Sequence, residues 1–428
     1  MTVIKKEDIL ILLTSILIFL FYFVGFYFNE NSAGAGGING DFALIWVNLQ
    51  LFENDILGSL DSTLYNDSRT PIAYILHVLF NPFIESQYQF RLSVLFISLL
   101  CPIFFYFSLK IKYKNINQYI AIFISSLILL SPYFRTSAYW GLGENYGILF
   151  LLISYLIFEK KKYLGKNLDF KQLFNLFLLS FSSSLCLYFD QKLAIVPFFC
   201  FCSIIFDKKI NKHIKILLTL FYVIFSIPFL YMIYLWGGIL PPSANNARQP
   251  GSEFHILNIG YAATIIAFYL LPFLLFFQKK NLFFLFINFF RKKNIFYFIL
   301  FFTYLFFVLF FSNFFELNNM GKGWFHKLTT ILFDNKNIQY LVTLLFFFIS
   351  WVLICIYLDQ KVFDKIIIYF LLIMSFFVYP LYQEYFDPLI LILIFTFLQK
   401  KIFINYKNIF ILSIYLFILL ILSNLFYF

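Results

Sequence analysis

A long polar passage near the start of the chain carries the residues best suited to chemistry. It covers residues 39–71, holds five acidic residues from Asp41 to Asp67, and has one base, Arg69. The Asp41 carboxylate could act as a general base that takes a proton from an attacking hydroxyl group. Asp is also a favoured N-cap residue, so Asp41 could cap a helix over residues 42–52. The two roles are compatible.

Arg69 stands at the far end of this passage, next to a helix-start signal. Pro71 is typical of a first helical turn. Thr70 could therefore cap a helix there, with Arg69 facing the polar passage. Alternatively, Arg69 could lie at the level of the lipid headgroups.

Three further bases are candidates for binding a phosphate group. Arg91 begins an apolar run, Arg135 follows one, and Lys192 lies in a turn between two. A phosphate at the membrane surface needs cationic donors at headgroup depth, and an Arg guanidinium matches its oxygens in a fork. Each of the three could instead be an anchor whose charge reaches back to the interface.

Four more polar residues at the ends of apolar runs could bind substrate: Glu144, Gln191, Glu384 and Tyr385. A carboxylate where Glu144 stands is costly unless it is hydrated or paired, although acids are also favoured in the first turn of a helix. Asp190 and Gln191 could do no more than pair with Lys192. Glu384 and Tyr385 belong to the last polar turn.

The histidines predict no metal site. They are scattered and form no ligand pair at helical spacing: His77, His213, His255 and His326. We therefore expect no cofactor. A divalent metal is compatible with the chemistry, but no residue pattern indicates one.

The composition indicates a membrane protein rather than a soluble one. Of 428 residues, 62% are hydrophobic and 12% charged, and the mean hydropathy is +0.85. A soluble domain has about twice that charged fraction. Apolar runs of roughly 16–22 residues recur along the chain, which is the length that crosses a bilayer as a helix. The net charge of +11 does not indicate nucleic-acid binding, because the bases lie in short loops between the runs.

We predict an all-α polytopic membrane protein with about thirteen transmembrane helices. The predicted spans are 9–28, 90–109, 117–131, 143–158, 172–189, 193–206, 214–235, 256–277, 295–311, 338–358, 366–380, 388–398 and 408–427. Residues 71–84 are predicted to form an interfacial or re-entrant helix in the first outer loop, since a crossing there would put the next basic cluster outside. The run 281–290 is predicted to lie along the cytoplasmic surface.

This topology places the N-terminus in the cytoplasm and the C-terminus outside. Most of the Lys and Arg residues then lie inside, as the positive-inside rule requires. We predict an N-terminal catalytic module, 1–235, that includes the outer loop 29–89. The C-terminal helices, 236–428, complete the same integral domain.

The structure of two other predicted outer segments can also be predicted from the sequence. Residues 132–142 are predicted to be a loop that follows Ser131-Pro132. A surface helix is predicted from Gly321 toward Phe333, with Trp324 suited to the membrane interface.

The order of these motifs resembles the glycosyltransferase C superfamily, membrane enzymes that take a sugar from a polyprenyl- or dolichyl-phosphate carrier. It is similar to that of protein O-mannosyltransferases and aminoarabinose transferases over about residues 8–210. The residues that carry this resemblance are Asp41, Thr70-Pro71, Arg91-Leu92, Ser131-Pro132 and Glu144. The chain departs from the pattern at Phe42, where many relatives have a second acid.

A fainter resemblance involves two polar turns. Asp190-Gln191-Lys192 and Glu384-Tyr385-Phe386 look like the Arg-Gln and Glu-Arg-Tyr elements of dolichyl-phosphate-glucose-dependent glucosyltransferases. Asp190 stands where those enzymes have Arg.

The resemblance implies an inverting glycosyltransferase that acts on the outer face of a bacterial inner membrane. Asp41 would deprotonate or orient the acceptor group, while Arg91, Arg135 and Lys192 would hold the carrier phosphate as leaving group. The implied partners are a polyprenyl-phosphate-linked sugar donor, a glycan, lipid or protein acceptor, and membrane lipid.

A polytopic lipid or glycan transporter or flippase is the competing interpretation. Transporters place ionisable residues near the bilayer midplane, whereas the charges here cluster at one predicted face. A glycan polymerase or ligase is the third interpretation and predicts a larger outer loop rich in Arg and His. The predicted loop 312–337 has only His326 and three Lys.

Overall fold

The structure is a computed structural model that describes residues 5–32, 40–160, 169–241, 243, 255–278, 281–291, 295–311, 321–358, 362–378, 380–400 and 402–427. All regular secondary structure in these ranges is helical, and they contain no strand. The predicted all-α class is confirmed.

Seven helical segments among the described residues are long and apolar enough to cross a membrane. They are α1 (Lys6–Tyr27), α5 with α6 (Gln87–Ser98 and Leu100–Lys112), α10 (Phe170–Phe189), α12 (Lys212–Trp236), α14 (Leu257–Phe276), α18 (Lys336–Leu358) and α21 (Tyr406–Tyr427). The count reaches nine if each of two bent helix pairs is one span. The chain is therefore a multi-pass membrane protein by helix length and composition, and the larger number of crossings stays a prediction.

Other predicted spans form shorter helices. These are α9 (Glu144–Glu159), α11 (Ile195–Ile205), α19 (Val362–Ser375) and α20 (Leu389–Phe395). At a rise of 1.5 Å per residue, the seven residues of α20 reach only about 10 Å. The hydrocarbon core is about 30 Å thick, so the predicted span 388–398 does not form a helix that crosses it.

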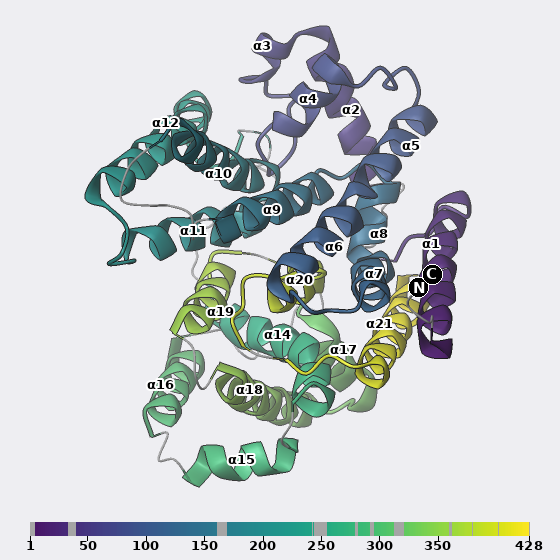
Figure 1. Ribbon diagram of the computed structural model, residues 1–428, viewed down its shortest axis with the longest axis vertical. Helices are drawn as coiled ribbons and strands as arrows, with labels where there is room; N and C mark the ends of the chain where they lie inside the picture. Colours follow the sequence, from purple (N-terminus) through teal and green to yellow (C-terminus); the bar gives the residue numbers. More distant parts are fainter. Residues whose placement is uncertain are drawn as a thin grey trace. The chain divides into compact units, whose positions relative to one another are not determined.

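The chain divides into two compact units. The first contains Met1–Pro250 and Leu416–Phe428, and the second contains Gly251–Tyr415. In the first unit α9 packs along α10, and α10 packs along α12 (Figure 1). In the second unit α14 packs against α18, α19 and α17 (Gly323–Leu332).

The first polar passage contains two helices, α2 (Asp41–Asn54) and α3 (Ile56–Ser59), and α4 (Ile72–Phe80) follows it directly. Phe52 of α2 is fully buried and stacks on Tyr74 of α4, with ring centroids 5.8 Å apart. The nine residues of α4 reach about 14 Å, which is too short to cross a bilayer. The predicted short helix at 71–84 is therefore present.

The beginnings of two helices differ from prediction. Gly40, not Asp41, is the N-cap of α2, and Asp41 is the first helical residue, where its charge still favours the positive end of the helix dipole. Pro71 occupies the N-cap position of α4. The Thr70 hydroxyl does not cap that helix, because it donates a hydrogen bond to the Tyr188 carbonyl.

Residues predicted as the loop 132–142 contain a helix, α8 (Pro132–Tyr139). Ser131 caps it by accepting a hydrogen bond from the Phe134 N–H (3.1 Å), and Pro132 occupies its first turn. Ser followed by Pro is a helix-start signal, so this prediction was wrong. The preceding helix, α7 (Gln118–Ser126) with η1 (Leu127–Leu130), bends by 69° into α8.

The segment from Gly321 toward Phe333 forms a helix as predicted, and the run 281–290 is also helical. The first is α17, which begins at Gly323. The second is α15 (Leu282–Arg291), followed by the separate helix α16 (Ile295–Phe311). The location of α15 at the cytoplasmic surface stays a prediction.

Candidate functional site

Four of the predicted site residues meet in the first unit: Arg69, Glu144, Gln191 and Lys192. The Arg69 Nη2 atom forms an ion pair with Glu144 Oε1. Gln191 Nε2 donates to the Ser68 carbonyl at 2.9 Å. With Asp67, Tyr133 and Asp190, which contact them, these four residues are called the Arg69 cluster below.

The loop that carries Arg69 is fastened to the turn between α10 and η3 (Gln191–Ala194). The hydrogen bonds from Thr70 to Tyr188 and from Gln191 to Ser68 join the two segments. Within the loop, the Tyr65 hydroxyl donates to the Arg69 carbonyl at 2.7 Å. The backbone around Arg69 is therefore held from both sides.

The turn at Asp190 is built by its own side chain. Asp190 ends α10 and is the N-cap of η3. Its Oδ1 accepts a hydrogen bond from the Lys192 N–H at 3.1 Å. Its Oδ2 lies 2.9 Å from Lys192 Nζ, so the predicted pairing of Asp190 with Lys192 is confirmed. The same ammonium lies 4.4 Å from the centroid of the Tyr133 ring.

Glu144 begins α9 and is completely buried. Its Oε1 atom accepts hydrogen bonds from Arg69 and from the Tyr133 hydroxyl. Its Oε2 atom has no hydrogen-bond partner among the residues that the structure describes. Burial of an unsatisfied carboxylate oxygen is costly, so this atom is suited to bind water or a ligand hydroxyl.

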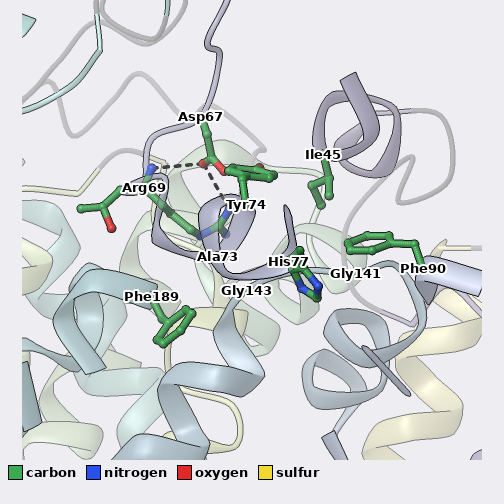
Figure 2. A pocket seen from close by; sticks show the side chains of 11 residues that line it. Ile45, Asp67, Arg69, Ala73, Tyr74, His77, Phe90, Gly141, Gly143 and Phe189 are labelled. Carbon is green, nitrogen blue, oxygen red and sulfur yellow. Dashed lines mark hydrogen bonds and ion pairs between the residues drawn. The ribbon is translucent and has the colours of Figure 1, made fainter. Parts of the chain in front are cut away.

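A pocket opens beside the Arg69 cluster, with a hollow of about 370 Å³ including its mouth (Figure 2). Asp67 and Arg69 form its polar side, and Tyr74, Phe90 and Phe189 contribute aromatic walls. Asp67 Oδ2 accepts from the Tyr74 hydroxyl at 2.7 Å, and its Oδ1 lies 3.4 Å from Arg69 Nη1. Both oxygens of this carboxylate are thereby oriented at the edge of the pocket.

His77 also lines the pocket, one helical turn after Tyr74 on α4. Its Nδ1 lies 2.9 Å from the Asn81 amide nitrogen, and its Nε2 lies 2.9 Å from the Tyr146 hydroxyl. Because the amide nitrogen can only donate, Nδ1 accepts and Nε2 carries the proton. Burial lowers the pKa of His77 to about 4. The imidazole is therefore neutral at pH 7.

The charges of the Arg69 cluster are unequal, with three carboxylates and two cations. Burial opposes the charge of Arg69, but Glu144 and then Asp67 raise its pKa well above the usual value, so it stays charged. Burial raises the pKa of Asp190, the neighbouring Lys192 lowers it, and Glu144 raises it, so that the pKa lies above its usual value. With its excess of acids, the cluster is better suited to hydroxyl groups than to a phosphate.

Arg135 lies in a different place and its donors are occupied. It is fully buried, forms an ion pair with Glu30 through Nη2, and donates from Nε to the same carboxylate at 2.8 Å. Its Nη1 donates to the Leu129 carbonyl and its Nη2 to the Phe21 carbonyl, both at 3.2 Å. This geometry does not support the predicted phosphate contact, because a protein carboxylate already fills the guanidinium fork.

Arg91 contacts Tyr139 at the end of α8, as Arg135 also does. Its Nε donates to the Tyr139 carbonyl at 2.6 Å, and its Nη2 donates to Asn29 Oδ1 at 2.9 Å. The guanidinium stacks on Trp140, 3.8 Å from the ring centroid. Arg91 and Arg135 thus connect the end of α1 to the end of α8.

The other predicted residues do not join the Arg69 cluster. Asp41 is exposed at the start of α2 and does not line the pocket. Glu384 and Tyr385 belong to η4 (Gln383–Tyr385) in the second unit. There, Gln383 Oε1 accepts from the Trp324 N–H at 3.0 Å.

Four residues of the site were not predicted from the sequence: Asp67, Tyr74, His77 and Tyr133. Two signals could have indicated them. Asp67 stands two residues before Arg69 in the same polar passage. Tyr74 and His77 are three residues apart, which places them on one face of a helix.

No group of three or more His, Cys, Asp or Glu side chains that could hold a metal ion occurs in the described part of the chain. No protein-family model, no curated protein and no solved structure matches the chain.

Proposed function

We propose that the chain is an inverting membrane glycosyltransferase that moves a sugar from a polyprenyl-phosphate carrier to an acceptor on the outer face. The observation that carries the proposal is the pocket at Asp67 and Arg69, which joins an oriented carboxylate to aromatic walls.

The proposed reaction is a single displacement. An acceptor oxygen or nitrogen attacks the anomeric carbon from the side opposite the carrier. The new bond forms while the bond from that carbon to the phosphate oxygen breaks, and the phosphate leaves with the electron pair. A carboxylate takes the acceptor proton as general base.

Asp67 is the carboxylate that we assign to this role. It lies at the pocket edge, and Tyr74 and Arg69 fix the orientation of its two oxygens. Asp41, which the resemblance implies as the base, lies outside the pocket lining and becomes the second candidate. Substrate orientation depends on groups placed within hydrogen-bond reach of the reacting atoms, and this condition favours Asp67.

The remaining residues of the cluster would contact the sugar of the donor. Glu144 Oε2, which has no partner among the described residues, would accept a hydrogen bond from a sugar hydroxyl. Lys192 and Arg69 are the cations of the cluster, and each is already paired with carboxylates of the cluster, so they would orient these carboxylates toward the sugar.

The test compares the surface glycans and glycolipids, by mass spectrometry, of cells with and without the protein. Loss of the protein is expected to remove one glycan species, and the wild-type chain to restore it. We expect Asp67→Asn to lower its amount at least about 100-fold, which is the lower limit for loss of a general base. Asp61→Asn is the matched control, because Asp61 is an exposed acid of the same polar passage.

Two results would contradict parts of this proposal. An unchanged glycan profile without the protein would exclude the transferase and leave a transporter as the better interpretation. Normal glycans with Asp67→Asn but not with Asp41→Asn would return the role of base to Asp41.

A further inference from the structure

The start of α17, in the second unit, has an unusual backbone. Gly321, Lys322 and Gly323 all have positive φ, at 74°, 66° and 77°. This region is unfavourable for a residue with a side chain such as Lys322. The Lys322 N–H donates to the Leu381 carbonyl at 2.6 Å, which fastens the turn. The turn places Lys322 Nζ 5.3 Å from the centroid of the Tyr261 ring.

His326, in the first turns of α17, packs against the same tyrosine. The two ring centroids are 5.3 Å apart in an edge-to-face arrangement, and His326 is only 3% exposed. Neither imidazole nitrogen has a hydrogen-bond partner among the described residues, and neither does the Tyr261 hydroxyl. Buried polar atoms are normally satisfied, so this region is suited to a ligand that supplies oxygen atoms.

The charges around His326 are mainly positive. Burial, and then the nearby Lys322 and Lys327, lower its pKa to about 4. The imidazole is therefore neutral at pH 7, and one of its nitrogens carries a proton that can be donated. Glu384 lies near Lys327, where it raises the pKa of that lysine against the effect of burial. Two ammonium groups thus accompany a single carboxylate.

We propose that Lys322, His326 and Lys327 bind a phosphate group at the start of α17. The two ammonium groups would neutralise its charge, the imidazole N–H would donate to one of its oxygens, and the N-terminal end of the helix dipole would favour the anion. The phosphate could belong to a lipid headgroup or to a small soluble molecule. This proposal does not rest on the proposed glycosyltransferase activity.

The test measures binding of two phosphate probes to the purified full-length protein. Phosphatidylglycerol binding is measured by native mass spectrometry, and inorganic phosphate binding by calorimetry. Lys322→Gly is the informative variant, because glycine adopts positive φ readily and the substitution removes the charge without straining the turn. We expect it to weaken binding about ten-fold, as for loss of a charge-assisted contact.

Lys336→Gln provides the matched control, since Lys336 is an exposed lysine at the start of α18. Its binding is expected to equal that of the wild type. Weakened binding of both probes in Lys322→Gly would indicate a site open to free phosphate, and weakened binding of the lipid alone would indicate a headgroup site. Equal binding by Lys322→Gly and the wild type, or no binding of either probe to the wild type, would overturn the proposal.

Discussion

At the scale of single residues, the pairing of charges decides what each candidate can do. Glu144 and Arg135 both stand out in the sequence because they interrupt apolar runs. The sequence predicts that Glu144 needs water or a partner, and that Arg135 binds a phosphate or anchors at the interface. It does not predict which partner, because Arg69 lies 75 positions from Glu144 and Glu30 lies 105 positions from Arg135.

The ion pair of Arg135 with Glu30 allows a test of whether Arg135 stabilises the fold or binds the donor phosphate. Arg135 has no exposed surface and the Glu30 side chain is 10% exposed. Arg135→Gln would leave a buried carboxylate without its cation. We expect it to reduce the free energy of unfolding by about 3 kcal/mol, typical of breaking a buried ion pair. Chemical denaturation in detergent would measure the loss.

The double variant Arg135→Gln with Glu30→Gln is the control. It removes both charges and should recover part of the stability, since no isolated charge stays buried. If Arg135→Gln instead kept wild-type stability and lost donor binding, the phosphate role implied by the resemblance would be correct.

At the scale of elements, the sequence predicted where helices form better than where they begin. Apolar periodicity and Pro71 indicated α4, and Gly321 to Phe333 indicated α17, because these signals are local. The sequence did not predict α8, since Ser131-Pro132 is both the end of an apolar run and a helix-start signal. The loop at Arg69 was also beyond prediction, because its position depends on hydrogen bonds to Tyr188 and from Gln191.

The turn between α8 and α9 positions Glu144, and Gly141 is its critical residue. Gly141 has a φ of 73°, and a Cβ atom there would lie 2.5 Å from Phe90 Cε1. We expect Gly141→Ala to reduce the free energy of unfolding by about 1–2 kcal/mol, the cost of a left-handed conformation with a side chain. The pocket would also change shape, because Phe90 lines it. Thermal unfolding in detergent would measure the effect.

Gly143→Ala is the matched control for this prediction. Gly143 lies two residues further along the same turn, and its φ is −72°. A Cβ atom there would meet the Ala73 Cβ at 3.4 Å and the Phe189 carbonyl oxygen at 3.9 Å, with no closer contact. A loss of stability in Gly143→Ala as large as that in Gly141→Ala would show that the left-handed backbone is not the cause.

At the scale of the whole molecule, composition was sufficient to predict a multi-pass helical membrane protein. The number of crossings was not predictable in the same way. Hydropathy registers an apolar run such as 388–398 without showing that its helix stops after seven residues. Hydropathy also does not show that α7 bends by 69° into α8.

The distribution of charge between the two units was visible only in the structure. The first unit collects acids around Arg69 beside the pocket. The second collects lysines around His326.

The most direct test of the proposed activity is the rate at which the purified protein, in lipid nanodiscs with an envelope extract as acceptor source, releases carrier phosphate from labelled polyprenyl-phosphate monosaccharides. The wild type and Asp61→Asn are expected to react at equal rates. Asp67→Asn is expected to react at least about 100-fold more slowly, with unchanged thermal unfolding. Equal rates for Asp67→Asn and the wild type, or no release by the wild type from any donor, would contradict the assignment of this pocket as the site of glycosyl transfer.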